Sequence, residues 1–256
     1  MAQTYLQLVN LVLQGLRENT VSTVSATPYS QLIGRWVNDA KRQVEDAWDW
    51  QTLNATSTFS LVPLIGTLTN PTQLAQQTYR MNDVSVTSVY DYNPNNVVVT
   101  MTGRARLRHD VMVPVRPMAF DMTTGLPMQL IEYPVDWIYR TRFIQPTKLT
   151  QTQPMFFGTA KQGDTIAVEL FEYPIAVRNW QFCWTLPQED LVNDIDYMLI
   201  PHYPVVAIAT DIAMAERGEE IGEPGNNVTA RAALHIDNAI ALDARDQQHK
   251  QTFTVD

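Results

Sequence analysis

The sequence predicts an α+β fold, in which a helical bundle built from N- and C-terminal helices carries an inserted, antiparallel β-rich domain. Near both ends of the chain, apolar residues recur at steps of three and four, which is typical of amphipathic helices. Between them, short segments rich in valine, threonine and aromatic residues alternate with turn residues, which is typical of antiparallel strands. The expected division is residues 1–50 plus 198–247 for the bundle, 51–197 for the β-rich domain and 248–256 for a loose tail.

Two helices are predicted at the N-terminus, over residues 4–18 and 28–48. Thr27 and Pro28 are typical of an N-cap followed by proline at the first helical position. The apolar faces are expected to be Tyr5, Leu8, Val9, Val12, Leu13 and Leu16 in the first helix, and Leu32, Ile33, Trp36, Val37, Ala40, Val44, Ala47 and Trp48 in the second. The charged residues Arg35, Asp39, Lys41, Arg42 and Asp46 are expected largely on the opposite, solvent-facing side.

The central region is predicted to be made of short strands. They are expected at 57–61, 84–90, 96–102, 128–131, 137–142 and 165–171. After an ambiguous stretch at 188–200, two more helices are predicted over 204–217 and 226–246. The last of these has Val228, Ala232, Ile236, Ala239, Ile240 and Asp243 along one side. Because isolated helices of this length are marginal in water and their apolar faces must be covered, the two ends of the chain are expected to pack together.

Two tryptophans lie where the second helix should give way to strands. Trp48 and Trp50 are two residues apart, a spacing that shares a face on a strand but not on a helix. We therefore expect Trp48 to be buried in the bundle and Trp50 to be the first strand-like residue at the junction of the two parts. The alternative is that both are ordinary core residues.

Composition excludes several classes of protein. The net charge of −9 over 256 residues argues against generic DNA binding through a basic surface. The single cysteine, Cys183, allows no intramolecular disulfide. No apolar stretch approaches the roughly 20 residues that span a bilayer, so no membrane contact is expected.

Catalytic and ligand-binding motifs are missing from the sequence. The four histidines are scattered, and there is no zinc motif, phosphate-binding glycine loop or nucleophile elbow, so we expect no catalytic residues, cofactor or metal. The acidic pairs Glu189-Asp190, Asp194/Asp196 and Glu219-Glu220 are expected to be solvated, and a hydrolase interpretation rests on them alone.

One charge pattern suggests an interaction surface. Arg104, Arg106 and Arg108 would share one face of a strand. Such a row is typical of a solvated edge strand that resists aggregation. The more specific interpretation is that the row is a docking ridge for an acidic partner. A neighbouring copy of this acidic chain could provide the acidic surface through Glu216, Glu219, Glu220 and Glu223.

The two ends of the sequence resemble the tail tubular protein A family of head-to-tail adaptors from short-tailed bacteriophages. The resemblance is carried by Val21–Val24, Asn38-Asp39-Ala40, Val44-Glu45-Asp46 and Trp48, and by the alanine-rich stretch 213–220 with its Glu-Arg-Gly turn. It covers about 50 residues at the start and about 45 near the end. The β-rich middle is similar only in its composition.

The resemblance implies a structural protein of the virion, made in the host cytoplasm and placed at the head–tail junction. It implies a ring, usually of twelve copies, between the portal protein and the tail nozzle protein, through which DNA passes without sequence-specific binding. The alternative is a virion receptor- or carbohydrate-binding protein that uses the aromatic residues of its β-rich domain, such as Tyr90, Tyr92, Trp137 and Tyr139.

Overall fold

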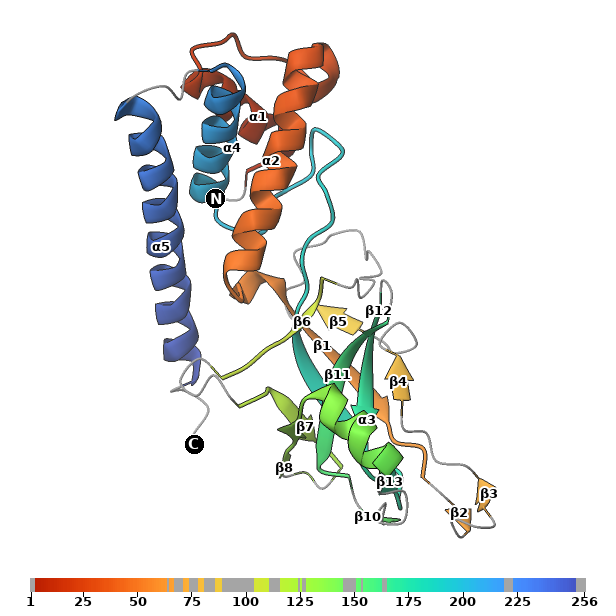
Figure 1. Ribbon diagram of the computed structural model, residues 1–256. Helices are drawn as coiled ribbons and strands as arrows, with labels where there is room; N and C mark the ends of the chain where they lie inside the picture. The colour runs from red at the N-terminus through yellow and green to blue at the C-terminus, as the bar shows by residue number, and fades with distance from the viewer. Residues whose placement is uncertain are drawn as a thin grey trace. The chain divides into compact units, whose positions relative to one another are not determined.

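The computed structural model describes residues 3–63, 65–66, 71–73, 78–80, 86–88, 104–110, 116–123, 125, 128–144, 151–152, 154–162, 165–218 and 223–251. The chain divides into two compact units. The helical unit contains residues 1–53 and 187–256, and the β unit contains residues 54–186 (Figure 1). The predicted α+β class, with helices from both chain ends and an inserted β-rich region, is confirmed.

The described part of the helical unit has four α-helices. They are α1 (Tyr5–Gly15), α2 (Pro28–Ala47), α4 (His202–Glu216) and α5 (Glu223–Gln251), with single 3-10 turns at Val24–Ala26 and Gln51–Leu53. Helices α1, α2 and α4 pack against one another, and α5 lies along α4 (Figure 1). Helix α5 continues to Gln251, so it includes residues that the sequence assigned to a loose tail.

Local sequence explains where the first two helices begin. Thr4 and Thr27 are both N-caps, and each forms a capping box with the residue three positions on, Gln7 and Ser30 respectively. The cap satisfies backbone N–H groups that have no partner inside the helix. The predicted cap at Thr27, with Pro28 as the first helical residue, is confirmed.

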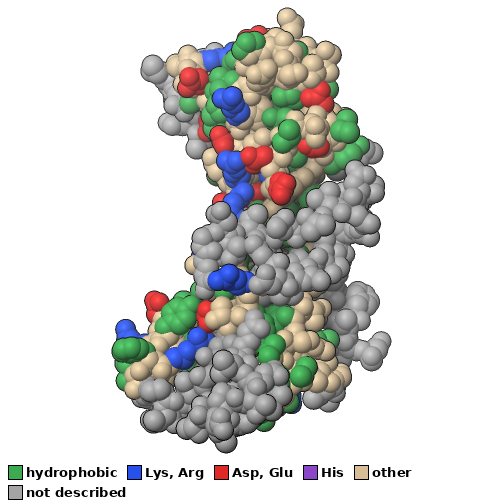
Figure 2. Space-filling view, turned by 90° about the vertical axis from the view of Figure 1, so that its right-hand side faces the viewer, with side chains coloured by type: hydrophobic (Ala, Val, Ile, Leu, Met, Phe, Trp, Pro, Cys, Tyr) green, Lys and Arg blue, Asp and Glu red, His purple; other side chains and the backbone are tan. Residues whose placement is uncertain are grey.

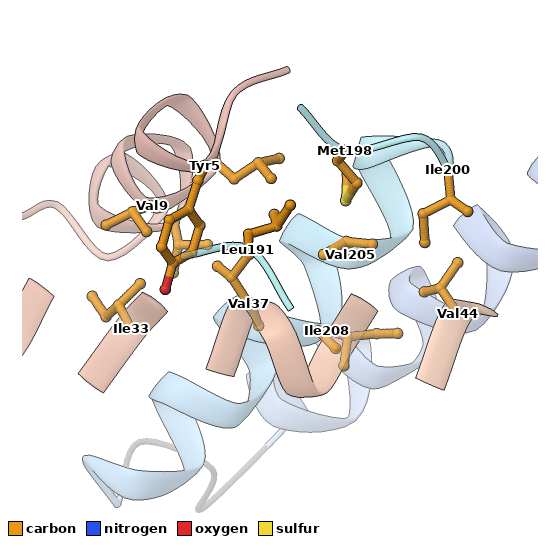
Figure 3. Close-up of a cluster of buried hydrophobic side chains, with 14 of the residues drawn as sticks. Tyr5, Val9, Ile33, Val37, Val44, Leu191, Met198, Ile200, Val205 and Ile208 are labelled. Carbon is orange, nitrogen blue, oxygen red and sulfur yellow. The ribbon is translucent and has the colours of Figure 1, made fainter. Parts of the chain in front are cut away.

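The core of the helical unit combines both ends of the chain. All six predicted apolar residues of α1 are buried, and Ile33, Val37 and Val44 of α2 are fully buried. Side chains from α1, α2, α4 and the segment before α4 point into one cluster (Figure 3). Since burying one large apolar side chain contributes roughly 1.5–3 kcal/mol, this shared core is the main force that holds the two chain ends together.

The return segment, residues 187–201, leads from the β unit back to α4 and belongs to the helical unit. It therefore joins the helices before residue 198, where the sequence placed the boundary. Its backbone is irregular but is bonded to the start of α1: the amides of Tyr5 and Leu6 donate to the carbonyls of Asp196 and Asp194, at 2.8 and 3.2 Å. These long-range hydrogen bonds hold the segment in place of regular secondary structure. The segment therefore has no hydrophobic periodicity from which the sequence could have predicted it.

Within its described residues, the β unit has two main sheets and two small strand pairs. The larger sheet has the order β5-β1-β14-β7-β8, with β6 also paired to β14, and the second has the order β4-β12-β11-β9. The strands of the larger sheet are β1 (Asn54–Ser60), β5 (Val86–Ser88), β6 (Arg106–Leu107), β7 (Ala119–Asp121), β8 (Met128–Gln129) and β14 (Asn179–Thr185). Those of the second are β4 (Thr78–Arg80), β9 (Ile131–Glu132), β11 (Phe156–Gln162) and β12 (Thr165–Leu170). The small pairs join β2 (Ile65–Gly66) to β3 (Pro71–Gln73) and β10 (Gln151–Thr152) to β13 (Tyr173–Pro174).

Aromatic side chains form the core of the β unit. The central pair, β1 and β14, is antiparallel, with Phe59 opposite Trp180. The ring of Phe182 stacks on Phe59, with centroids 5.4 Å apart, and meets Phe157 of the second sheet edge-on at 5.0 Å. These contacts connect the two sheets through a single buried cluster.

The predicted strand at 137–142 is wrong, because these residues lie in helix α3 (Val135–Ile144). Its aromatic and branched residues match strand composition, but the helix packs on β11 and β12. Ile138 is fully buried, and Glu169 of β12 accepts hydrogen bonds from Tyr139 and Arg142 at 3.1 and 2.9 Å. The predicted strand at 96–102 lies outside the described residues.

Candidate interaction surfaces

Trp50 belongs to the core of the helical unit and does not begin a strand. Its side chain is 1% exposed, and its indole Nε1 donates to the carbonyl of Val44 at 2.7 Å. A 3-10 turn follows, and the first strand starts only at Asn54. The expectation that Trp50 is the first strand-like residue is therefore wrong: the indole N–H finds its partner at the end of α2, so the tryptophan stays with the helices.

Trp48 ties the end of α2 to α5. It is half-buried against the same core, and its Nε1 donates to Oδ2 of Asp243 at 2.9 Å. The backbone amide of Gln51 also points to this carboxylate, at 3.3 Å from Oδ2. Asp243, which the sequence placed on the same side of the last helix as Ile236 and Ile240, therefore receives hydrogen bonds from the chain just after α2.

The three arginines of the predicted ridge do not form one exposed row. Arg104 lies in a turn and Arg106 in β6, and both are half-buried. Arg108 is only 5% exposed. Burial raises the pKa of the nearby Cys183 thiol, and the charge of Arg108 acts against that increase. Arg108 therefore contributes to the interior of the β unit, and only Arg104 and Arg106 offer surface to a partner.

The predicted acidic partners are described only in part. Glu216 is exposed at the end of α4. Glu219 and Glu220 lie outside the described residues, as does the side chain of Glu223 at the start of α5. Of the residues predicted to form the contact between neighbouring copies, Arg104, Arg106 and Glu216 are therefore the ones that the structure describes at the surface.

A buried ion pair, missed in the sequence, joins α2 to the return segment. Lys41 and Glu45 are fully buried, with Nζ and Oε1 3.1 Å apart. Nζ of Lys41 also donates to the carbonyl of Gln188 at 2.7 Å, and Oε1 of Glu45 accepts from the Gln188 amide at 3.1 Å. The expectation that Lys41 faces solvent is wrong, because residues far along the chain cover it and satisfy its charge.

The Asn-Asp-Ala motif also joins α2 to the return segment. The Asn38 side chain pairs with both backbone groups of Leu191: Nδ2 donates to its carbonyl at 3.0 Å, and Oδ1 accepts from its amide at 2.9 Å. One turn on, Arg42 forms ion pairs with Asp39 and Asp190 at the surface. The hydrogen bond to Asp190 is the largest cause of the raised pKa of Arg42.

Part of the return segment exposes apolar side chains on a fixed backbone. In the exposed loop, residues 191–197, Val192, Ile195 and Tyr197 are 75%, 76% and 59% exposed. Asp196 Oδ2 accepts hydrogen bonds from the backbone amides of Val192 and Asn193, at 2.8 and 2.7 Å. Partial burial favours the protonated acid, but these amides outweigh it, and the pKa of Asp196 lies below its usual value.

A groove of about 730 Å³ runs between α1, α4 and α5. Its walls include Leu11 and Gln14 of α1, Tyr203, Ala207 and Met214 of α4, and His235 of α5. Among the described side chains that line it, none is Asp, Glu, Lys or Arg. The groove is therefore an uncharged and largely apolar surface in an acidic protein.

Aromatic rings gather at one end of this groove. The ring centroids of His202 and Tyr203 are 4.0 Å apart, and those of Tyr203 and His235 are 6.4 Å apart. Burial lowers the pKa of His202, so its imidazole is neutral near pH 7.

The described residues contain no group of three or more His, Cys, Asp or Glu side chains placed to hold a metal ion. Within the same residues, none of the helices combines the length and apolarity that a membrane-spanning segment needs. A scan against protein-family models finds no match, and a search of curated proteins finds no significant relative.

Proposed function

We propose that this chain is a structural head-to-tail adaptor of a tailed bacteriophage, which forms a ring between the portal protein and the tail nozzle protein. The observation that carries the proposal is that residues of the resembling N-terminal stretch hold a distant part of the chain in place. Asn38 and Glu45, which lie in the resembling stretches, hold the return segment against α2. The shared stretches at the two chain ends thus correspond to the parts that build one helical unit, as an adaptor bundle requires.

The distribution of charge supports passage of DNA without retention. Residues 54–186 contain nine acidic and ten basic residues, whereas the rest of the chain contains 18 acidic and eight basic ones. Binding to DNA gains most of its free energy from neutralised phosphates. A ring whose helical units carry this acidic excess would not hold the DNA that passes through it.

The proposal is tested by assembly with a portal protein. The purified chain is mixed with portal rings of the same phage, and the mass of the particles is measured by native mass spectrometry and their symmetry by electron microscopy. A ring of adaptor copies on one face of the portal supports the proposal. Failure to bind the portal under any assembly condition, with a folded chain by circular dichroism, contradicts it.

The arginine–glutamate contact between copies is part of the same proposal. Reversal of charge at Arg104 and Arg106 should weaken ring formation, and a further Glu216→Arg change should restore part of it. The buried Arg108 is left unchanged in this test, since its replacement would destabilise the β unit. Unchanged assembly in the doubly reversed variant would remove this contact from the proposal.

The second candidate, a virion protein that binds a receptor or carbohydrate, is favoured by two aromatic side chains. Trp137 and Tyr139 of α3 are 40% and 41% exposed, and the Trp137 ring stacks on Tyr133 with centroids 4.6 Å apart. Exposed aromatic faces are suited to stacking on sugars. Glycan-array binding by the full chain that is lost in Trp137→Ala would favour this function over the adaptor.

A further inference from the structure

We propose that the exposed loop, residues 191–197, of one copy docks into the groove between α1, α4 and α5 of a second copy. This inference rests on the proposed function, because it names the surfaces through which copies would join in a ring. It is carried by three properties of the helical unit: a rigid apolar projection, an uncharged groove, and the different residues that form the two surfaces.

The exposed loop is rigid enough to act as a projection. Besides the two amides that Asp196 binds, the loop is fixed to α1 by the amides of Tyr5 and Leu6, and to α2 by Asn38. Three large apolar side chains on such a backbone lose little further conformational entropy when a partner covers them. Scattered apolar residues at a surface need no explanation, but three on one short fixed loop suggest a binding site.

The three aspartates in and beside the loop are already bound within the chain. Asp196 accepts the Val192 and Asn193 amides, Oδ1 of Asp194 accepts the Val24 amide at 3.0 Å, and Asp190 pairs with Arg42. Their hydrogen-bonding capacity is therefore directed inward, toward the helical unit. What the loop offers to a partner is mainly the apolar surface of Val192, Ile195 and Tyr197.

The groove matches this surface in chemistry and size. Its described lining contains no Asp, Glu, Lys or Arg, although the helical unit as a whole has a large acidic excess. Two copies of such a unit repel each other over most of their surfaces, so a contact is favoured where charge is missing. The groove volume of about 730 Å³ lies within the roughly 300–1,000 Å³ of typical binding clefts, which accommodates a few side chains.

The projection and the groove are formed by different residues of the helical unit, although both adjoin the start of α1, where Thr4 bridges to Tyr197 and Gln3 lines the groove. The loop and the rest of the return segment are bonded to α2 through Asn38 and Lys41, whereas α5, one wall of the groove, packs on α4. In Figure 1 the outer part of the return segment lies beside α2 on the side away from α5. Figure 2, which views the molecule from that side, shows hydrophobic side chains at the surface of the helical unit among charged ones.

Because the two surfaces are formed by different residues, a contact between them is heterologous. Each copy uses its loop on one neighbour and its groove on the other, and such contacts generate rings when the rotation closes. A contact of the isologous type, in which the same patch meets itself, would stop at a dimer. The two arrangements therefore predict different products in a cross-linking experiment.

The experiment places one cysteine on each surface, in a Cys183→Ser background. Ile195→Cys is made in one chain and Ala207→Cys in another, and the mixed chains are oxidised gently, alone and with portal rings. We expect a cross-linked dimer that contains one chain of each kind. A chain that carries both substitutions should give a ladder of cross-linked products beyond the dimer. The matched control replaces Ile195→Cys with Ile175→Cys, which removes an exposed apolar residue of the β unit (53% exposed, against 76% for Ile195) and should give little product.

The outcomes separate this inference from the proposed function. Rings on the portal with no cross-linked ladder overturn the docking of the loop and leave the adaptor function standing. A ladder without rings on the portal supports the contact between copies and contradicts the adaptor function. If the products of the doubly substituted chain stop at the dimer, or if the Ile175→Cys control gives an equal yield, the inference is overturned. A variant with Ile195→Glu should lose association measured by sedimentation, whereas Ile175→Glu should retain it.

Discussion

Nζ of Lys41 lies 3.1 Å from Oε1 of Glu45, and both side chains are completely buried inside the helical unit. Lys41→Met should lower the free energy of unfolding by about 3–5 kcal/mol, since it leaves a buried carboxylate without its counter-charge. Urea unfolding followed by far-ultraviolet circular dichroism measures the change. Adding Glu45→Gln, which removes the charge but keeps an acceptor for the Gln188 amide, should recover part of the loss. No recovery would mean that Lys41 acts mainly through Gln188.

Asn38 and Asp39 are adjacent in sequence but should differ sharply in their effect on stability. Asn38→Ala removes both hydrogen bonds to Leu191 and should cost about 1–3 kcal/mol, because it leaves backbone groups of the return segment without their partner. Asp39→Ala removes only an exposed ion pair with Arg42 and should cost less than about 1 kcal/mol. Thermal unfolding of the two variants side by side tests the difference, and equal shifts would contradict this account.

The two tryptophans provide a second matched pair. Trp50→Ala should destabilise the helical unit by about 3–5 kcal/mol through the cavity it leaves. Trp48→Phe keeps an aromatic ring but loses the bond to Asp243, and should cost about 1 kcal/mol. If Trp48 acts through that bond, its effect should largely vanish in an Asp243→Ala background. Full additivity in this double-mutant cycle would refute the link between the end of α2 and α5.

Asp196 makes the exposed loop sensitive to acid. Since the pKa of Asp196 is lowered in the folded chain, its stabilising effect is fully present above the unfolded value of about 3.9 and is lost as the pH falls through the lower folded value. Asp196→Asn should therefore be less stable than the parent by a constant amount between pH 5 and 7, and the gap should shrink below about pH 4. Urea midpoints across this range provide the measurement. Glu189→Gln, which removes an exposed charge from the same segment, is the control and should show no such trend.

Signals that are local in sequence predicted the N-terminal helices well. Thr27 and Pro28 determine where α2 begins, and the spacing of Leu8, Val9 and Val12 determines the buried face of α1. Both features depend only on residues within one or two helical turns. The same is true of α4, which begins two residues before the expected Pro204.

Features that depend on distant partners were predicted poorly. Lys41 looks like a surface residue until Gln188 covers it, and Val135–Ile144 looks like a strand until β11 and β12 provide a surface for a helix. The exposed loop has no periodicity, because its backbone is held by Asn38 and the start of α1 and not by a regular ladder. The groove was not foreseen at all, since it is formed by three helices whose facing sides are known only once they pack.

The shared core of α1, α2 and α4 also imposes a delay during synthesis. The apolar faces of α1 and α2 leave the ribosome first, yet Val205 and Ile208, which cover them, follow more than 150 residues later. At translation rates of about 5–20 residues per second, the nascent N-terminus waits roughly ten to thirty seconds for its partner. Throughout that interval the β unit is being made, so the first helices remain open to chaperones, or to other nascent chains, until α4 has been synthesised.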